Sequence, residues 1–301
     1  MLGHAAVPEV KGPWMNRRDT TIDLHTHTLA SDGSDTSLEL VEAAAKAGIE
    51  MLAVTDHDTV EGVEAALAAG IGLGVEVLPG CEITGEVGGR VVHLLAYGAG
   101  LLAPGAVDRV VAVRRERADR NRRIGAKLEA LTGVGHTHAL ELAGGSALSR
   151  AHFAQALVRR GAVGTVAEAF DRYLSNGRPA YVAAPSLPVQ EVFALVHSLG
   201  GVVVLAHPGR LAPNERESVV AAALAAGLDG LEVWHSQHDA DAGRHWLQAA
   251  ERHGLLATGG SDYHGRHKPS VSLGSGTDGD VLVSACAVAE LKERLARAVR
   301  R

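Results

Sequence analysis

Aromatic residues are scarce in this chain: phenylalanine, tyrosine and tryptophan make up only 3% of its 301 residues. A hydrophobic core must therefore be built from leucine, valine, isoleucine and alanine, within an apolar fraction of 46% that is ordinary for a globular protein. Cysteine is scarcer still. With only Cys81 and Cys286 present, the sequence predicts no disulfide framework.

The chain also lacks an apolar run long enough to cross a membrane, and it lacks the features of a signal peptide. We therefore expect a cytoplasmic protein with no membrane contact and no stable protein partner. An excess of positive charge is absent too. The net charge of −6 argues against a nonspecific hold on nucleic acid through overall charge. Residues 1–19 have no periodicity, and we expect them to form a flexible leader.

Strand and helix patterns alternate along most of the chain. Alternation runs through residues 20–103, gives way to helical periodicity alone in residues 104–180, and returns in residues 181–301. Repeated strand–helix units predict a parallel sheet. The expected strands cover residues 20–24, 49–55, 74–84, 90–98, 201–207, 228–235 and 255–262.

Seven such strands in a chain of this size favour an α/β fold of the closed, distorted (β/α)7 barrel type. Periodicity alone does not distinguish this barrel from an open sheet. The predicted barrel domain comprises residues 20–103 and 181–301. The predicted helical insertion subdomain, residues 104–180, follows the fourth strand.

Histidine is abundant, with 16 residues, and many histidines and carboxylates fall at or near strand ends. Six of the seven expected strands carry such residues, namely His25, His27, Asp56, His57, Asp58, Glu82, His93, His207, Asp262 and His264. Functional groups of such barrels gather at the C-terminal ends of the strands. A single histidine or carboxylate there is commonly a cap or a turn residue, but side chains from six strands would meet at one rim.

Carboxylates that converge at a rim repel one another, and buried ionised groups are costly without a compensating cation. Divalent metal ions would offset that cost. Mixed imidazole and carboxylate ligands suit manganese, iron or zinc better than calcium or magnesium. The sequence therefore predicts a metal centre, and a lone serine or cysteine nucleophile is not supported, because no Gly-x-Ser-x-Gly motif is present.

Six motifs together resemble one family. "DLHTHTLASDGS", "TDHDT", "CEIT", "HLLAYG", "AHPGR" and "GGSDYHG" occur in this order and resemble the polymerase-and-histidinol-phosphatase (PHP) family of metal-dependent phosphoesterases. The resemblance runs from about Thr21 to Lys268. "SRAHFAQALV" and "RYLSNGRPAYV" resemble a branch that hydrolyses nucleoside 3′,5′-bisphosphates and trims short RNA from its 5′ end. That branch usually has proline where this chain has Ala151.

The resemblance implies two or three divalent cations per chain, with manganese first and iron or zinc as alternatives. It implies that His25, His27, Glu82 and Asp262 hold one metal. Glu82, His93 and His207 would hold a second, with Glu82 as a bridge. Asp32, His57 and His264 would hold a third, so the glycine turn after strand one would return Asp32 to the centre.

Four residues are candidates for substrate contacts. Arg150 lies on the insertion, and the bidentate fork of an arginine suits a second phosphate. His152 is a candidate acid near the leaving group, and Arg178 and Lys268 are candidate anion contacts. The run "RRERADRNRR" holds six arginines; it could steer anions, but we favour a solvated helix face.

We expect hydrolysis of the 3′-phosphate of nucleoside 3′,5′-bisphosphates by attack of a metal-activated hydroxide on phosphorus, and possible partners include short RNA oligonucleotides. One alternative is a phosphomonoesterase of the histidinol-phosphatase type, although a small monoester needs no second phosphate anchor. An amidohydrolase would need a bridging lysine, and no lysine lies at a strand end. A non-catalytic metal-binding module would be expected to have lost ligands.

Overall fold

The computed structural model describes residues 21–143, 148–183, 185–277 and 279–300, so the expected leader lies outside the described residues. Its strands are β1 (Thr21–Thr26), β2 (Ile49–Val54), β3 (Glu76–Val87), β4 (Arg90–Tyr97), β5 (Leu187–Pro188), β6 (Val202–Leu205), β7 (Gly230–His235) and β8 (Leu256–Gly260). The helices outside the predicted insertion are α1 (Ser37–Lys46), α2 (Val63–Leu73), α7 (Val189–Ser198), α8 (Arg216–Ala226), α9 (Ala240–His253) and α10 (Ala285–Ala298).

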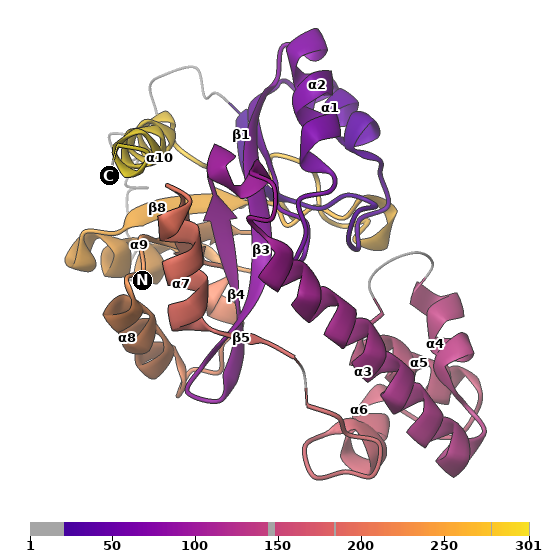
Figure 1. Ribbon diagram of the computed structural model, residues 1–301. Helices are drawn as coiled ribbons and strands as arrows, with labels where there is room; N and C mark the ends of the chain where they lie inside the picture. The colour runs from indigo at the N-terminus through magenta and orange to yellow at the C-terminus, as the bar shows by residue number, and fades with distance from the viewer. Residues whose placement is uncertain (1–20, 144–147, 184, 278, 301) are drawn as a thin grey trace, which may run out of the picture.

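Seven strands form one curved sheet in the order β1-β2-β3-β4-β6-β7-β8, and the short strand β5 pairs with β3 off this path. The two ends of the sheet approach each other. Asp262 N–H donates to the His25 carbonyl at 2.9 Å, and His27 N–H donates to the Tyr263 carbonyl at 3.0 Å. The sheet is therefore a nearly closed barrel with its helices outside (Figure 1), and the prediction of a distorted (β/α)7 barrel is confirmed.

Strand β4 departs from the predicted parallel sheet, because it runs antiparallel to both β3 and β6. It is joined to β3 by a tight turn at Gly88 and Gly89, whose φ angles are +57° and +77°. Two consecutive positive φ angles are typical of the two-residue hairpin turn. The expectation of an all-parallel sheet was thus wrong at this strand. The glycine pair replaces the helix that a parallel crossover would need.

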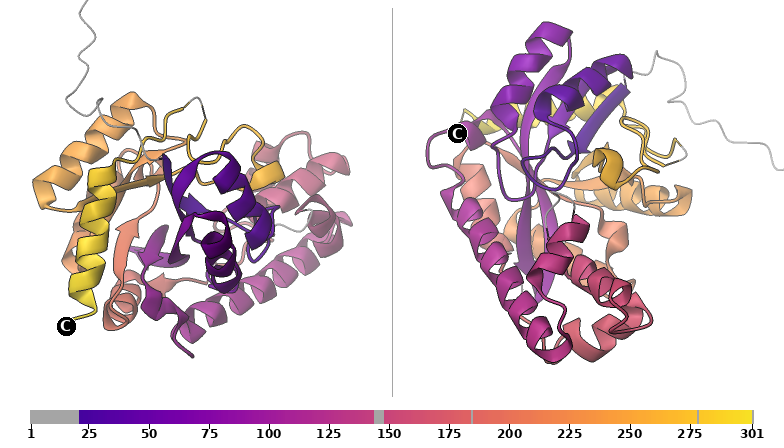
Figure 2. Two further views of the ribbon diagram at one scale, coloured as in Figure 1. Left: turned by 90° about the horizontal axis from the view of Figure 1, so that it is seen from above. Right: turned by 90° about the vertical axis from the view of Figure 1, so that its right-hand side faces the viewer.

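Helices dominate the segment between β4 and β5, namely α3 (Asp108–Thr132), α4 (His136–Ala143), α5 (Arg150–Arg159) and α6 (Val166–Ala169), followed by a π-helical turn at Phe170–Leu174. Helix α3 leads away from the barrel, and the other helices pack against its far half (Figures 1 and 2). They share their own hydrophobic cluster, which includes Ile124, Phe153 and Leu157. Among the described residues, no helix is long and apolar enough to span a membrane.

Candidate metal centre

Strand β1 delivers two histidines to the mouth of the barrel because of its alternation. Ile22 and Leu24 pack into a hydrophobic cluster, whereas His25 and His27 share the opposite face of the strand. Both imidazoles are fully buried. A single polar face at the end of an otherwise apolar strand therefore explains the His-Thr-His sequence.

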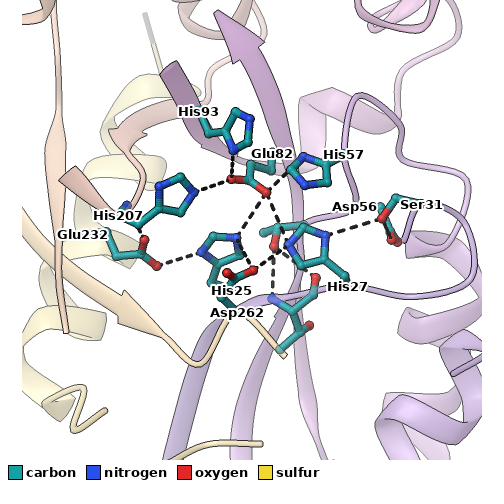
Figure 3. Close-up of polar contacts among 12 residues, drawn as sticks. His25, His27, Ser31, Asp56, His57, Glu82, His93, His207, Glu232 and Asp262 are labelled. Atoms are coloured by element: carbon teal, nitrogen blue, oxygen red, sulfur yellow. Dashed lines mark hydrogen bonds and ion pairs between the residues drawn. The ribbon is translucent and has the colours of Figure 1, made fainter. Parts of the chain in front are cut away.

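Glu82 lies at the middle of the centre (Figure 3). The sequence pattern predicted it at the end of its strand, but β3 continues beyond it to Val87 as part of the hairpin. One carboxylate oxygen, Oε1, lies 2.9 Å from His93 Nδ1 and 3.0 Å from His207 Nε2. The other, Oε2, lies 3.1 Å from His57 Nδ1 and 3.3 Å from Nε2 of both His25 and His27.

The carboxylates of Asp32 and Asp262 lie at two further sides of the centre. Asp32 Oδ1 lies 3.2 Å from His264 Nε2 and 3.4 Å from His27 Nδ1, and its Oδ2 lies 3.7 Å from His57 Nε2. Asp262 Oδ1 lies 3.3 Å from His27 Nε2. All nine predicted ligand residues are thereby brought together, including His93, which the antiparallel β4 supplies from its first half.

The donor set fits divalent cations. Among the described residues, four buried imidazole nitrogens have no hydrogen-bond partner, namely His25 Nε2, His27 Nε2, His57 Nδ1 and His93 Nδ1. Unsatisfied buried polar atoms are costly, yet each of these lies within 3.3 Å of a Glu82 oxygen. Three groups have ligand atoms within 4.8 Å of one another: His27, Asp32, His57 and His264; His25, His27 and Asp262; and His57, Glu82 and His93. Nitrogen and oxygen ligand atoms that converge in this way suit a metal ion, to which each imidazole offers a lone pair once it is neutral.

The pKa shifts follow from this crowding. Burial lowers the pKa of His57 to about 3 and that of His207 to about 4, so both imidazoles are neutral at pH 7 and able to bind a metal. Burial would raise the pKa of Glu82, but His57, His93 and the other imidazoles hold it well below its usual value. Burial would also lower the pKa of His27, yet the neighbouring carboxylates raise it to about 9.

Comparison with known proteins identifies the family of the chain. The model of the PHP domain matches residues 23–178. The chain belongs to the PHP family. This confirms the predicted family and, at the level of reaction class, a metal-dependent phosphoesterase.

Three relatives of this PHP protein are similar over most of their length. The 3′,5′-nucleoside bisphosphate phosphatase of Chromobacterium violaceum is 34% identical over 81% of this chain and 87% of its own. The 5′-3′ exoribonuclease Rnm of Salmonella typhimurium is 34% identical over 84% and 87%. A crystal structure of a metal-dependent phosphoesterase from Bifidobacterium adolescentis has a TM-score of 0.72 at 35% identity and covers 91% of this chain and 96% of its own.

Backbone strain is concentrated at the candidate metal centre. Among the described residues, the non-glycine residues with positive φ are Asp58 at 51°, His207 at 29° and Asp262 at 57°. His207 and Asp262 are predicted ligands, and Asp58 adjoins His57. Such conformations cost of order 1–3 kcal/mol each and persist where the surroundings over-determine them. The strain therefore indicates a functional site.

Two glycines let the backbone approach the ligands closely. A Cβ on Gly33 would lie 2.3 Å from the His27 carbonyl oxygen, and one on Gly260 would lie 2.3 Å from the His25 nitrogen. Gly33 thus permits the turn that returns Asp32 to the centre, and Gly260 permits β8 to close against β1.

Sequence reasoning missed the residues that support the ligands. Glu232 on β7 is fully buried; its Oε1 lies 2.8 Å from His25 Nδ1, and its Oε2 accepts the His207 backbone N–H at 2.6 Å. Asp23 is also fully buried and accepts four hydrogen bonds, from the backbone of His25, Ser261 and Gly274 and from the Ser261 hydroxyl. A charged residue inside an apolar strand was the available signal for both.

The structure places His235, at the end of β7, beside the centre. Its Nε2 lies 3.4 Å from Asp262 Oδ2, and its ring forms a further candidate metal group with His25 and Glu232.

The predicted substrate residues are spread more widely than the ligands. The Arg150 guanidinium lies 5.8 Å from the Phe170 ring and 5.9 Å from the Tyr181 ring, and donates weakly to the Leu174 carbonyl at 3.4 Å. Arg178 pairs with Asp171 at 2.8 Å. Within the described residues, the contacts of both arginines are with residues between Phe170 and Tyr181, and neither arginine contacts any of the nine predicted ligands.

His152 and Lys268 approach the centre more closely. Burial lowers the pKa of His152, and the nearby Asp32 carboxylate opposes that shift. His152 Nδ1 accepts the Ser149 N–H at 3.1 Å, so the neutral ring carries its proton on Nε2. Lys268 Nζ lies 2.6 Å from Asp262 Oδ2, which makes it a partner of a predicted ligand.

The arginine run on α3 is only partly the solvated face that we favoured. Arg114 donates to the Ala30 carbonyl at 2.6 Å, two residues before Asp32. Arg117 lies 2.7 Å from the buried Asp58 carboxylate, and Arg120 donates to the Val182 carbonyl at 2.9 Å. Residues three apart share a helix face, so these arginines form one stripe of the run. Arg114 and Arg117 join α3 to the loops that carry Asp32 and His57, whereas Arg120 joins it to the chain after the helices. Exposed Arg122 pairs with Asp119.

Proposed function

We propose that this protein removes the 3′-phosphate of nucleoside 3′,5′-bisphosphates and also trims short RNA from its 5′ end. The names of the two curated relatives support this substrate class. The observation that carries the proposal is the convergence of the nine predicted metal ligands at one centre, where three groups of their ligand atoms lie within 4.8 Å of one another. A helical segment beside the centre suits a substrate with a second phosphate.

We assign two or three divalent cations to the centre, with manganese first and iron or zinc as alternatives. His25, His27, Glu82 and Asp262 would hold one; Glu82, His93 and His207 a second; and Asp32, His57 and His264 a third. His57 also lies against Glu82, so it could serve the second site. When bound, such cations lower the pKa of a water and neutralise charge on phosphoryl oxygens.

The chain's own residues would then orient the substrate. We assign the second phosphate to Arg150, whose side chain lies near two rings that limit its freedom. Arg178 adds positive charge nearby. His152 presents its Nε2–H as a donor to the leaving oxygen, because Nδ1 is occupied by Ser149. Lys268 would orient the Asp262 carboxylate, from whose Oδ2 its Nζ lies 2.6 Å away, and would contribute positive charge near the scissile phosphate.

The division into a barrel domain of residues 20–103 and 181–301 and an insertion of residues 104–180 belongs to the same proposal. The separate hydrophobic cluster of the helical segment supports it. We also propose a cytoplasmic enzyme, since both cysteines are free thiols.

The test is phosphate release from adenosine 3′,5′-bisphosphate by the manganese-loaded protein, measured beside AMP and histidinol phosphate. We expect rapid release from the bisphosphate and little from the two monoesters. Activity on the monoesters alone would favour the histidinol-phosphatase alternative. Silence on all three substrates, in protein shown to carry metal, would favour a non-catalytic metal-binding module.

A further inference from the structure

A cavity of about 250 Å³ adjoins the metal centre between β4, β6 and the turn that follows β6. Its lining consists of Val91, Val92, His93, Leu205, Ala206, His207, Arg210 and Leu211. Two predicted metal ligands therefore form a wall that the cavity shares with the centre, while most of the remaining lining is aliphatic. Nothing in the proposed chemistry uses the aliphatic residues or Arg210.

The strand pleat places an apolar side chain directly beside a ligand. Val91 and His93 are two residues apart on β4 and share one face of it. Val91 is 46% exposed, although the neighbouring Val92 is buried. An aliphatic surface that stays open next to a metal ligand is available to a substrate whose phosphate lies at that metal.

Arg210 supplies the one full charge in the lining. It is exposed, and within the described part of the chain its guanidinium makes no hydrogen bond or ion pair. A free guanidinium beside aliphatic side chains suits a flat aromatic ring, which it can cover with its own plane.

The turn that carries Arg210 is held in place by several contacts. Arg216 donates to the carbonyls of Gly209 at 2.7 Å and Leu211 at 3.1 Å. His238 Nε2 accepts the Gly209 N–H at 3.0 Å. The wall opposite β4 is thus formed before any ligand binds, which lowers the entropic cost of binding.

We propose that this cavity binds the nucleobase of the substrate, with the ring between Val91, Leu211 and the Arg210 guanidinium. The inference rests on the proposed function. It assigns a site to the base, whereas the metals and Arg150 account only for the two phosphates. The volume falls below the roughly 300–1,000 Å³ of pockets for larger ligands, so it suits one base. Aliphatic walls do not select particular hydrogen-bonding edges, so we expect little preference among bases.

The experiment compares binding of AMP with binding of ribose 5-phosphate, which has the same phosphate and sugar but no base. Calorimetry on the manganese-loaded full chain gives both dissociation constants without turnover. We expect AMP to bind at least about tenfold more tightly, as one base-stacking contact supplies. Val91→Asp should reduce that ratio toward one. The matched control is Val299→Asp, at the exposed valine that caps the C-terminus of α10, and this variant should retain the ratio.

Other outcomes separate this inference from the proposed function. Equal affinity for AMP and ribose 5-phosphate would overturn the base site, while bisphosphate hydrolysis would still support the proposed function. An Arg210→Gln variant that weakens both ligands equally would mean that Arg210 binds phosphate, and would also overturn it. Absence of both AMP binding and bisphosphate hydrolysis would overturn the two together.

Discussion

The metal centre and the helical segment differ in how firmly their functional side chains are held. At the centre the ligands are mostly buried, and Glu232, Asp23 and Ser261 hold the strands that carry them. On the helical segment, Arg178 pairs with an exposed aspartate, and Arg150 makes one long hydrogen bond. The contrast teaches that the barrel fixes the proposed metal ligands, whereas the proposed substrate residues can change at little structural cost.

Removing the central carboxylate should have the largest effect. Glu82→Gln keeps the volume of the side chain but removes the negative charge that faces five histidines. We expect a loss of activity greater than the ~10–100-fold typical of residues that support ligands, together with a lower manganese content by elemental analysis. Full metal content and activity in this variant would contradict the central role of Glu82.

Metal uptake should depend strongly on pH. Without metal, the neighbouring carboxylates raise the pKa of His27 to about 9 and that of His25 well above its usual value, although burial opposes both shifts. Both imidazoles therefore hold a proton at pH 7 and must release it to bind a cation. We expect manganese affinity to rise with pH up to about 9, where the His27 proton is lost.

Calorimetry in two buffers of different ionisation enthalpy measures this proton release directly. His57 and His207 have pKa values of about 3 and 4 and contribute no protons at pH 7. A binding enthalpy that is independent of the buffer would show that His25 and His27 are already neutral.

Glu232→Gln tests whether Glu232 holds the proposed ligands His25 and His207 in place. The amide keeps the size of the side chain but weakens its interactions with the His25 ring and the His207 backbone. We expect manganese affinity to fall about 10–100-fold, as for other partners of ligating histidines. Glu50→Gln, at an exposed glutamate of β2, is the matched control and should bind metal normally. Equal affinities of the two variants would remove Glu232 from the centre.

Arg150→Ala moves the test to the helical segment. A hydrogen-bonded charge contributes about 1.5–3 kcal/mol, so we expect the KM for adenosine 3′,5′-bisphosphate to rise about 10–100-fold. The metal content should stay unchanged. Arg115→Ala, at an exposed arginine of α3, provides the comparison. An unchanged KM in the Arg150 variant would show that Arg150 does not bind the second phosphate.

The sequence predicted the barrel and the convergence of its ligands because both depend on local periodicity. His25 and His27 follow from the pleat of one strand, and His207 and Asp262 follow from the ends of two others. Glu82 and His93 lie instead within the β3–β4 hairpin. The orientation of β4 depends instead on the conformation of Gly88 and Gly89, which we did not interpret as a hairpin turn. The roles of Glu232 and Arg117 depend on contacts 207 and 59 residues apart, respectively, which no local pattern contains.

Arg117→Ala should have the smallest effect on chemistry and tests how the two regions are joined. The change leaves the Asp58 carboxylate buried without its cation, although it still accepts hydrogen bonds from the Thr84 N–H and hydroxyl. Because the arginine is partly exposed, we expect a loss of about 1–3 kcal/mol in the free energy of unfolding.

Arg115→Ala is the control, and its free energy of unfolding should stay within about 0.5 kcal/mol of that of the parent chain. Denaturant unfolding measures both, and Arg117→Lys should recover part of the loss because it restores the charge. Equal stabilities of the two alanine variants would mean that the ion pair between Arg117 and Asp58 does not help to hold the helical segment to the barrel.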